Sequence, residues 1–199
     1  MASSYPLKPS PFPAVTRIIS THDSNGKAIF SDTAASIPIT RVSDKPDDNI
    51  SPGFALAYWT DTFPVRGPSP TDENAQVAAN SDLHGYIAQL GGPRPPPVEQ
   101  CSTECLVVEF PPNFSAPMHS NAALDYGVIL SGTLEWKLDS TETRLLRNGD
   151  VIVQRGTAHA WRNVTPLTEN DGWLRAFFVS VPIEKAKLEG GKELGANME

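Results

Sequence analysis

The fold is decided by the stretch between Pro117 and Asn163, which contains, in order, His119-Ser120-Asn121, Asp125-Tyr126-Gly127, Ser131-Gly132, Gly149-Asp150 and Gly156-Thr157-Ala158-His159-Ala160-Trp161-Arg162-Asn163. Within and around it, short runs rich in β-branched, aromatic and other apolar residues alternate with turn residues. This pattern predicts seven strands, at residues 104–110, 126–130, 133–138, 143–146, 151–154, 158–163 and 173–181. Short strands at near-regular spacing are typical of an all-β sandwich or barrel.

The first half of the quoted stretch resembles the first sequence motif of the cupin superfamily. That motif is usually His-x-His, three or four residues, Glu, six residues and Gly. Here it reads His119-x-Asn121, three residues, Asp125, six residues and Gly132. The spacing is therefore kept, whereas two of the ligand types have changed.

The second half resembles the second cupin motif, in which a Gly precedes Pro-x-Gly-x-x-His-x-x-x-Asn. Here Gln154-x-Gly156-x-x-His159-x-x-x-Asn163 follows Gly149, with Gln in place of Pro. Over roughly residues 15–182 the chain is similar to a group of small single-domain cupins of fungi and bacteria, often found in natural-product pathways. This resemblance implies an all-β, single-domain cupin, which is a double-stranded β-helix or jelly-roll barrel.

The predicted organisation is one domain between two terminal segments, which suits a chain of 199 residues. The boundaries are an N-terminal extension at 1–14, a cupin domain at 15–182 with an N-terminal arm at 15–60, a proline-rich loop at 61–100 and barrel motifs at 104–181, and a C-terminal helix and tail at 183–199. The C-terminal helix is expected at Ile183–Leu188, which lacks Gly and Pro.

The N-terminal arm is predicted to contain a β-hairpin. Val15–Ile19 and Lys27–Phe30 are β-rich runs on either side of Ser24-Asn25-Gly26, and Asn-Gly between such runs is a strong hairpin signal. Further strands are expected around Ile37–Arg41 and at Phe54–Thr60.

The proline-rich loop carries a large share of the 19 prolines of the chain. Proline fixes φ and lacks the N–H that a sheet interior needs, so this segment is predicted to be a stiffened loop. One short helix is expected near Asn74–Leu83.

Charge and hydropathy argue against nucleic acid and membranes as partners. The net charge is −7, and the 16 Lys and Arg residues are scattered along the chain. No apolar run approaches the length of roughly 20 residues that a membrane helix needs, and the N-terminal residues do not resemble a signal peptide. We therefore expect a cytoplasmic protein with no nucleic-acid or membrane partner.

The candidate site follows from strand alternation combined with the resemblance. Residues two apart on a strand share a face, so His119 and Asn121 are expected to point the same way. In a cupin that face is the barrel interior, where Asp125 and His159 are expected to join them. Without a metal, two imidazoles and a carboxylate form an acid/base set, with His119 and His159 as acid and base and Asp125 orienting or assisting them.

A metal is the alternative that these residues leave open. Metal-binding cupins use three His and one Glu, and this chain offers His119, Asp125 and His159. Two His and a carboxylate still match the ligand set of non-haem iron oxygenases, and Fe, Mn, Ni, Cu or Zn would suit imidazole. The amide of Asn121 is a weak ligand and Asp125 is shorter than Glu, so we favour function without a cofactor.

Four residues are candidates for substrate binding. Asn121 lies two residues after His119 and Trp161 two residues after His159, so each is expected on the same face as that histidine. Trp161 could stack on a planar substrate. Tyr126 lies beside Asp125, and Tyr58 shares a strand face with Phe54 and Leu56.

The favoured hypothesis is a cupin lyase or cyclase that dehydrates, decarboxylates or cyclises a hydrophobic, aromatic or polyketide-like small metabolite. The first alternative is a metal-dependent oxygenase or isomerase that uses His119, Asp125 and His159 as ligands. The second is a non-catalytic small-molecule-binding cupin, because a fold alone does not fix a function. A homodimer is expected, with the N-terminal hairpin pairing with a second subunit.

Overall fold

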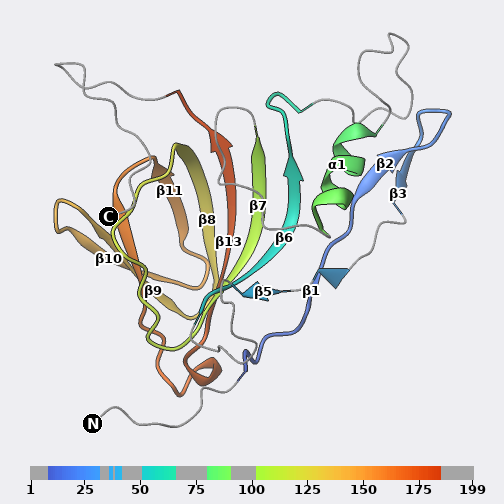
Figure 1. Cartoon of the computed structure of the whole chain (residues 1–199). Helices are drawn as coiled ribbons and strands as arrows, with labels where there is room; N and C mark the ends of the chain where they lie inside the picture. Colours follow the sequence, from blue (N-terminus) through green and yellow to red (C-terminus); the bar gives the residue numbers. More distant parts are fainter. Residues whose placement is uncertain are drawn as a thin grey trace.

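The computed structural model of the chain describes residues 9–31, 36–37, 39–41, 51–65, 80–90 and 102–184. Antiparallel strands dominate this part of the chain (Figure 1). The largest sheet has six strands in the order β11-β8-β13-β7-β6-β5. They are β5 (Thr40–Arg41), β6 (Gly53–Thr60), β7 (Thr103–Phe110), β8 (Ala123–Ser131), β11 (Val151–Arg155) and β13 (Leu174–Pro182).

A three-stranded sheet, in the order β10-β9-β12, completes the β-structure around the core. Its strands are β9 (Thr133–Leu138), β10 (Thr143–Arg147) and β12 (His159–Asn163). All seven strands predicted between residues 104 and 181 are present, with ends shifted by three residues at most. The all-β architecture expected from the sequence is therefore confirmed.

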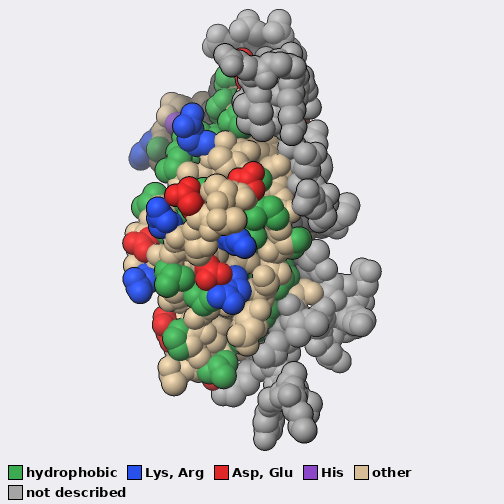
Figure 2. All heavy atoms as spheres, turned by 90° about the vertical axis from the view of Figure 1, so that its left-hand side faces the viewer, with side chains coloured by type: hydrophobic (Ala, Val, Ile, Leu, Met, Phe, Trp, Pro, Cys, Tyr) green, Lys and Arg blue, Asp and Glu red, His purple; other side chains and the backbone are tan. Residues whose placement is uncertain are grey.

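The main hydrophobic core is built by the inward-facing residues of both sheets. Along β8, buried and more exposed positions alternate, as a strand with one face on the core requires. Four core side chains, Ile129, Leu134, Ile152 and Leu174, are completely buried, and they come from four different strands. The surface over β9, β10 and β11 is mixed, with acidic, basic and apolar side chains interspersed (Figure 2).

The N-terminal hairpin is present, but its first strand is not the predicted one. β2 (Ser20–His22) pairs with β3 (Ala28–Phe30), whereas β1 (Val15–Thr16) pairs with β4 (Ser36–Ile37). The turn sets this register, because the carboxylate of Asp23 accepts hydrogen bonds of 2.9 Å from the backbone N–H groups of Asn25 and Lys27. Gly26 has φ +75°, which suits glycine.

Two further elements differ from the prediction. The single strand expected around Ile37–Arg41 is divided between β4 and β5, which belong to different sheets. A helix is expected near Asn74–Leu83; residues 74–79 lie outside the described ranges, and the described part contains the start of α1 at Ser81–Leu90. Tertiary packing determines its position, because Tyr86 is completely buried and its hydroxyl donates a 2.7 Å hydrogen bond to the carbonyl oxygen of Leu56 in β6.

The predicted C-terminal helix lies mostly outside the described residues, and Ile183 and Glu184 are not helical. No helix in the described ranges is both long enough and apolar enough to cross a bilayer. After β12 the chain returns to the large sheet through a 3₁₀ turn, η1 (Asn170–Gly172).

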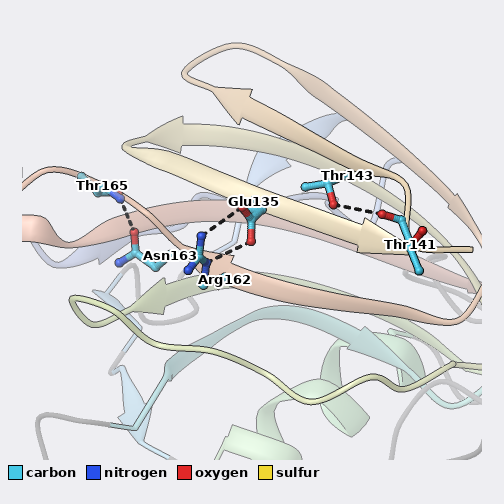
Figure 3. A network of polar contacts seen from close by, with 6 residues as sticks. All are labelled: Glu135, Thr141, Thr143, Arg162, Asn163 and Thr165. Carbon is cyan, nitrogen blue, oxygen red and sulfur yellow. Dashed lines mark hydrogen bonds and ion pairs between the residues drawn. The ribbon is translucent and has the colours of Figure 1, made fainter. Parts of the chain in front are cut away.

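Asn163, the last residue of the second motif, fixes the end of β12. Its Nδ2 lies 2.8–3.0 Å from the carbonyl oxygens of Phe110, Pro111 and Gly172, and its Oδ1 accepts a hydrogen bond of 2.9 Å from the N–H of Thr165. Figure 3 shows the contact with Thr165 beside the exposed ion pair of Arg162 with Glu135. Asn163 is 2% exposed, so this motif residue has a structural role.

Candidate functional site

A cavity of about 310 Å³ lies between the two sheets. Its lining is mainly apolar and aromatic, and it includes Phe54, Leu106, Phe110, Phe114, Trp161 and Phe178. Its polar side chains are His119, Asn121, Asp125, Gln154, His159 and Ser180, together with the buried Glu104. An apolar cavity with a few convergent polar groups is typical of a small-molecule site, and this volume is at the small end of such sites.

The two histidines face one another across a short antiparallel bridge. The N–H of each residue donates to the carbonyl oxygen of the other, at 2.9 Å and 2.8 Å. Their ring centroids are 4.2 Å apart, with 51° between the ring planes. His119 lies outside the regular strands, and this bridge to β12 brings it beside His159.

Backbone carbonyl groups fix the tautomer of both imidazoles. Nδ1 of His119 lies 2.9 Å from the carbonyl oxygen of Pro117, and Nδ1 of His159 lies 2.9 Å from that of Thr157. A carbonyl oxygen can only accept, so both Nδ1 atoms carry a hydrogen. When the rings are neutral, each Nε2 therefore has a free lone pair that can take a proton or bind a metal.

His159 is held in its neutral form. Its side chain is almost fully buried, with 1% of the residue exposed. This burial lowers the pKa of His159 to about 4, the hydrogen bond to Thr157 opposes the shift, and the positive charge that His119 can carry adds to it. At neutral pH His159 is thus a proton acceptor.

Asp125 lies between two hydrogen-bond donors from neighbouring strands. Gln154 of β11 and Ser180 of β13 are its direct cross-strand partners, so all three side chains share one face of the sheet. Oδ2 accepts from Nε2 of Gln154 at 3.0 Å, and Oδ1 accepts from the hydroxyl of Ser180 at 2.6 Å. Burial raises the pKa of Asp125, while hydrogen bonds from Ser180, Gln154 and Asn121 lower it and so limit the shift.

The expectation that Asp125 orients an imidazole is wrong. Both Nδ1 atoms are bonded to backbone carbonyl groups, and the carboxylate is held by Gln154 and Ser180. The sequence pattern did not identify either of these two residues as part of the site. Gln154 had one signal, since it replaces the usual proline of the second motif. Ser180 had no such signal, because the local sequence does not determine the register of its strand.

Five of the seven predicted site residues line the cavity, namely His119, Asn121, Asp125, His159 and Trp161. Trp161 packs with its ring centroid 4.9 Å from that of His159 and 5.5 Å from that of Trp136. Tyr126 lies elsewhere, because strand alternation turns it away from Asp125 and leaves it 46% exposed.

Tyr58 also lies outside the cavity, because a β-bulge interrupts its strand. Leu56 pairs with Leu106 and Tyr58 pairs with Cys105, so Ala57 is the extra residue. The bulge moves Tyr58 to the outer face, where its ring lies 4.7 Å from that of Tyr86 in α1. The tyrosine hydroxyl donates a hydrogen bond of 2.9 Å to Asp82, also in α1.

The described side chains do not fit the metal site that cupin motifs imply. His119 and His159 offer suitable Nε2 atoms, and Asp125 is held in the cavity wall by Gln154 and Ser180. In the described part of the chain, no three His, Cys, Asp or Glu side chains come together in a way that could hold a metal ion. The arrangement instead gives two imidazoles beside an apolar cavity, with a buried carboxylate in its wall.

Comparison with known proteins agrees with this architecture. The Cupin_2 family model, described as a cupin domain, matches residues 106–168, which include both motifs. Protein C' of the phomopsin biosynthesis cluster of Diaporthe leptostromiformis is 32% identical over 178 residues, covering 87% of this chain and 82% of that protein. The chain belongs to the cupin family. Its similarity to this relative extends well beyond the residues that the family model matches.

Two other fungal relatives match this cupin along most of its length. Protein J of the oryzines biosynthesis cluster of Aspergillus oryzae is 31% identical, covering 94% of this chain and 93% of that protein. A cupin-domain-containing oxidoreductase of Aspergillus ruber is 31% identical, covering 96% of this chain and 86% of that protein. These matches relate this cupin to proteins of natural-product pathways.

Proposed function

We propose that this cupin is a lyase or cyclase that acts on a small hydrophobic metabolite by proton transfer. The observation that carries the proposal is the pair His119 and His159, whose Nδ1–H groups are bonded to backbone carbonyl groups beside an apolar cavity. Dehydration, decarboxylation and cyclisation are reactions that need only a positioned acid and base in an enclosed site.

The two histidines take different roles in this proposal. His159 is the base, because its lowered pKa keeps Nε2 unprotonated at neutral pH. His119 is the acid that returns a proton to the leaving oxygen or to the rearranged carbon, since its ring is in contact with that of His159 and is less buried. Asp125 takes no part in this proton transfer and instead accepts hydrogen bonds from Gln154 and Ser180 in the cavity wall.

The relatives support a role in a biosynthetic pathway. Two of them carry the names of fungal biosynthesis clusters. The aromatic lining of Trp161, Phe178 and Phe110 suits a planar ring system, which stacks or packs edge-on against such side chains.

The test compares three strains that express the wild-type chain, His119→Ala or His159→Ala in a host that accumulates the pathway intermediate. Mass spectrometry follows conversion of the intermediate, and circular dichroism of the purified variants shows whether they are folded. We expect folded variants that no longer convert it. Unchanged product formation by both variants would overturn the proposal and leave a binding protein.

A metal-dependent oxidoreductase is the second candidate. It is favoured by the Aspergillus ruber relative, a cupin-domain-containing oxidoreductase, and by the two Nε2 lone pairs at the cavity, which would supply two of the ligands; no third His, Cys, Asp or Glu joins them among the described residues. Elemental analysis of protein purified without added metal, together with activity before and after chelation, separates the two candidates. Stoichiometric metal and loss of activity on chelation would favour the oxidoreductase.

A further inference from the structure

One wall of the cavity carries a row of three polar side chains from neighbouring strands. Gln154, Asp125 and Ser180 lie side by side on β11, β8 and β13, all facing the cavity. The facing sheet contributes His159 and Trp161. A ligand between the sheets therefore meets a polar wall on one side and an imidazole and an indole on the other.

Gln154 has an unused acceptor at this wall. The residue is 2% exposed, and its Nε2 donates to Oδ2 of Asp125 at 3.0 Å. That contact fixes the orientation of the amide, because the carboxylate oxygen needs a donor. The carbonyl oxygen Oε1 is buried and has no hydrogen-bond partner among the described residues. A buried acceptor without a donor is costly, and ligands commonly supply the missing partner.

We propose that Gln154 determines substrate specificity by accepting a hydrogen bond from a hydroxyl or N–H group of a neutral, largely apolar ligand. The proposal rests on the function proposed above and narrows its substrate class. The donor would be a phenolic, enolic or alcoholic O–H or an amide N–H, held against β11 while the rest of the ligand packs against Trp161 and Phe178.

The same wall disfavours a ligand with a carboxylate or phosphate group at this point. Such a group would place negative oxygen atoms against Oε1 of Gln154 and the carboxylate of Asp125. Among the described residues that line the cavity, none is Lys or Arg. Within the proposed function, this favours dehydration or cyclisation of a hydroxyl-bearing substrate over decarboxylation of an acid.

Three matched two-ring probes test the proposal by direct binding: 1-naphthol, 1-methoxynaphthalene and 1-naphthoate. The first has a donor, the second replaces the donor by a methyl ether, and the third is an anion. Isothermal titration calorimetry of the full wild-type chain should show naphthol binding about three- to tenfold more tightly than the methyl ether, the size of one net hydrogen bond. Naphthoate should bind most weakly.

Two variants test whether the preference for naphthol over the methyl ether depends on Gln154. Gln154→Met keeps the size and removes the acceptor, so it should bind naphthol and the methyl ether equally. Ser180→Ala removes another of the donors to Asp125 but keeps Oε1 of Gln154, so it should retain the preference for naphthol. Thermal melting shows that each variant is folded, and the wild-type comparison of probes stands even if Gln154→Met does not fold.

Several outcomes would overturn the proposal: equal wild-type affinity for naphthol and the methyl ether, a preference that survives Gln154→Met, naphthoate as the tightest probe, or no binding of any probe. Failure of the proposed function is distinguishable from these. If His119→Ala and His159→Ala still form product while the probe preference holds, the catalytic proposal fails and the specificity assignment to Gln154 stands.

Discussion

The imidazole of His119 lies against the imidazole of His159, with ring centroids 4.2 Å apart. The backbone bridge between the two residues and the carbonyl partners of both Nδ1 atoms fix this arrangement. A positive charge on His119 lowers the pKa of His159 further, because the two rings lie so close together. The two side chains therefore influence one another directly.

The first prediction is that alanine substitutions of the two histidines are not additive. Each of His119→Ala and His159→Ala should lower kcat/KM by about 10²- to 10⁴-fold, and the double variant should lose no more than about tenfold beyond that. Steady-state kinetics on the pathway intermediate measure this. Tyr126→Phe is the control and should keep wild-type rates, because Tyr126 lies outside the cavity. Losses that multiply would show that the histidines act independently.

The second prediction concerns acid stability. The pKa of His159 is about 4 in the folded chain and near its usual value of 6.5 when unfolded, so below pH 6.5 the unfolded state binds the proton first. Stability contributed by neutral His159 is fully present above pH 6.5 and is lost as the pH falls towards 4, by at most about 3 kcal/mol.

Urea unfolding at pH 7 and pH 4.5 tests this, with His159→Phe as the matched variant. On acidification, the unfolding free energy of the wild type should fall by roughly 2 kcal/mol or more relative to that of His159→Phe. The raised pKa of Asp125 acts with the opposite sign, but it is present in both proteins. A difference that does not change with pH would contradict the shift at His159.

The third prediction is that Asn163→Asp lowers the unfolding free energy far more than a substitution at a neighbouring surface residue does. The substitution replaces the Nδ2 donor by an acceptor facing the carbonyl oxygens of Phe110, Pro111 and Gly172, and it should cost about 3 kcal/mol or more. Arg162→Ala removes an exposed ion pair and should cost less than about 1 kcal/mol. Chemical denaturation of both variants gives the comparison, and similar costs would refute the structural role of Asn163.

The fourth prediction uses the contact of Gly127 with Phe178. A Cβ at Gly127 would lie 2.5–2.6 Å from the Phe178 ring, so Gly127→Ala must push this cavity-lining ring away. We expect a loss of about 1–3 kcal/mol and weaker ligand binding. Adding Phe178→Leu to Gly127→Ala should recover part of the stability. A fully stable single variant would show that the ring moves freely.

The fifth prediction is a homodimer through the N-terminal hairpin. An isolated two-stranded hairpin is marginally stable, and β3 leaves Phe30 77% exposed and Ile29 43% exposed. Light scattering should give twice the chain mass, and Phe30→Glu should reduce it towards the monomer. Val151→Glu is the control, because Val151 is 71% exposed on a different part of the surface. A wild-type protein that light scattering shows to be a monomer would contradict this prediction.

The fold and part of the site could be predicted from the sequence because both depend on local patterns. The strand pattern indicated the seven barrel strands, and the resemblance to the cupin motifs predicted that His119, Asp125 and His159 meet at one cavity. The contacts of Asp125 could not be predicted, because Gln154 and Ser180 become its neighbours only through the register of three strands. Hydrogen bonds between each imidazole and a nearby carbonyl group depend on backbone conformation, which motif spacing does not specify.

The bulge at Ala57 divides β6 into two functional halves. Residues before it, such as Phe54, form part of the cavity wall, whereas Tyr58 after it supports α1. If Ala57 instead paired regularly with Cys105, Tyr58 would lie opposite Glu104 and its phenol would reach the ligand side. Whether this strand takes up its extra residue as a bulge can therefore change what the protein recognises while both signature motifs stay intact.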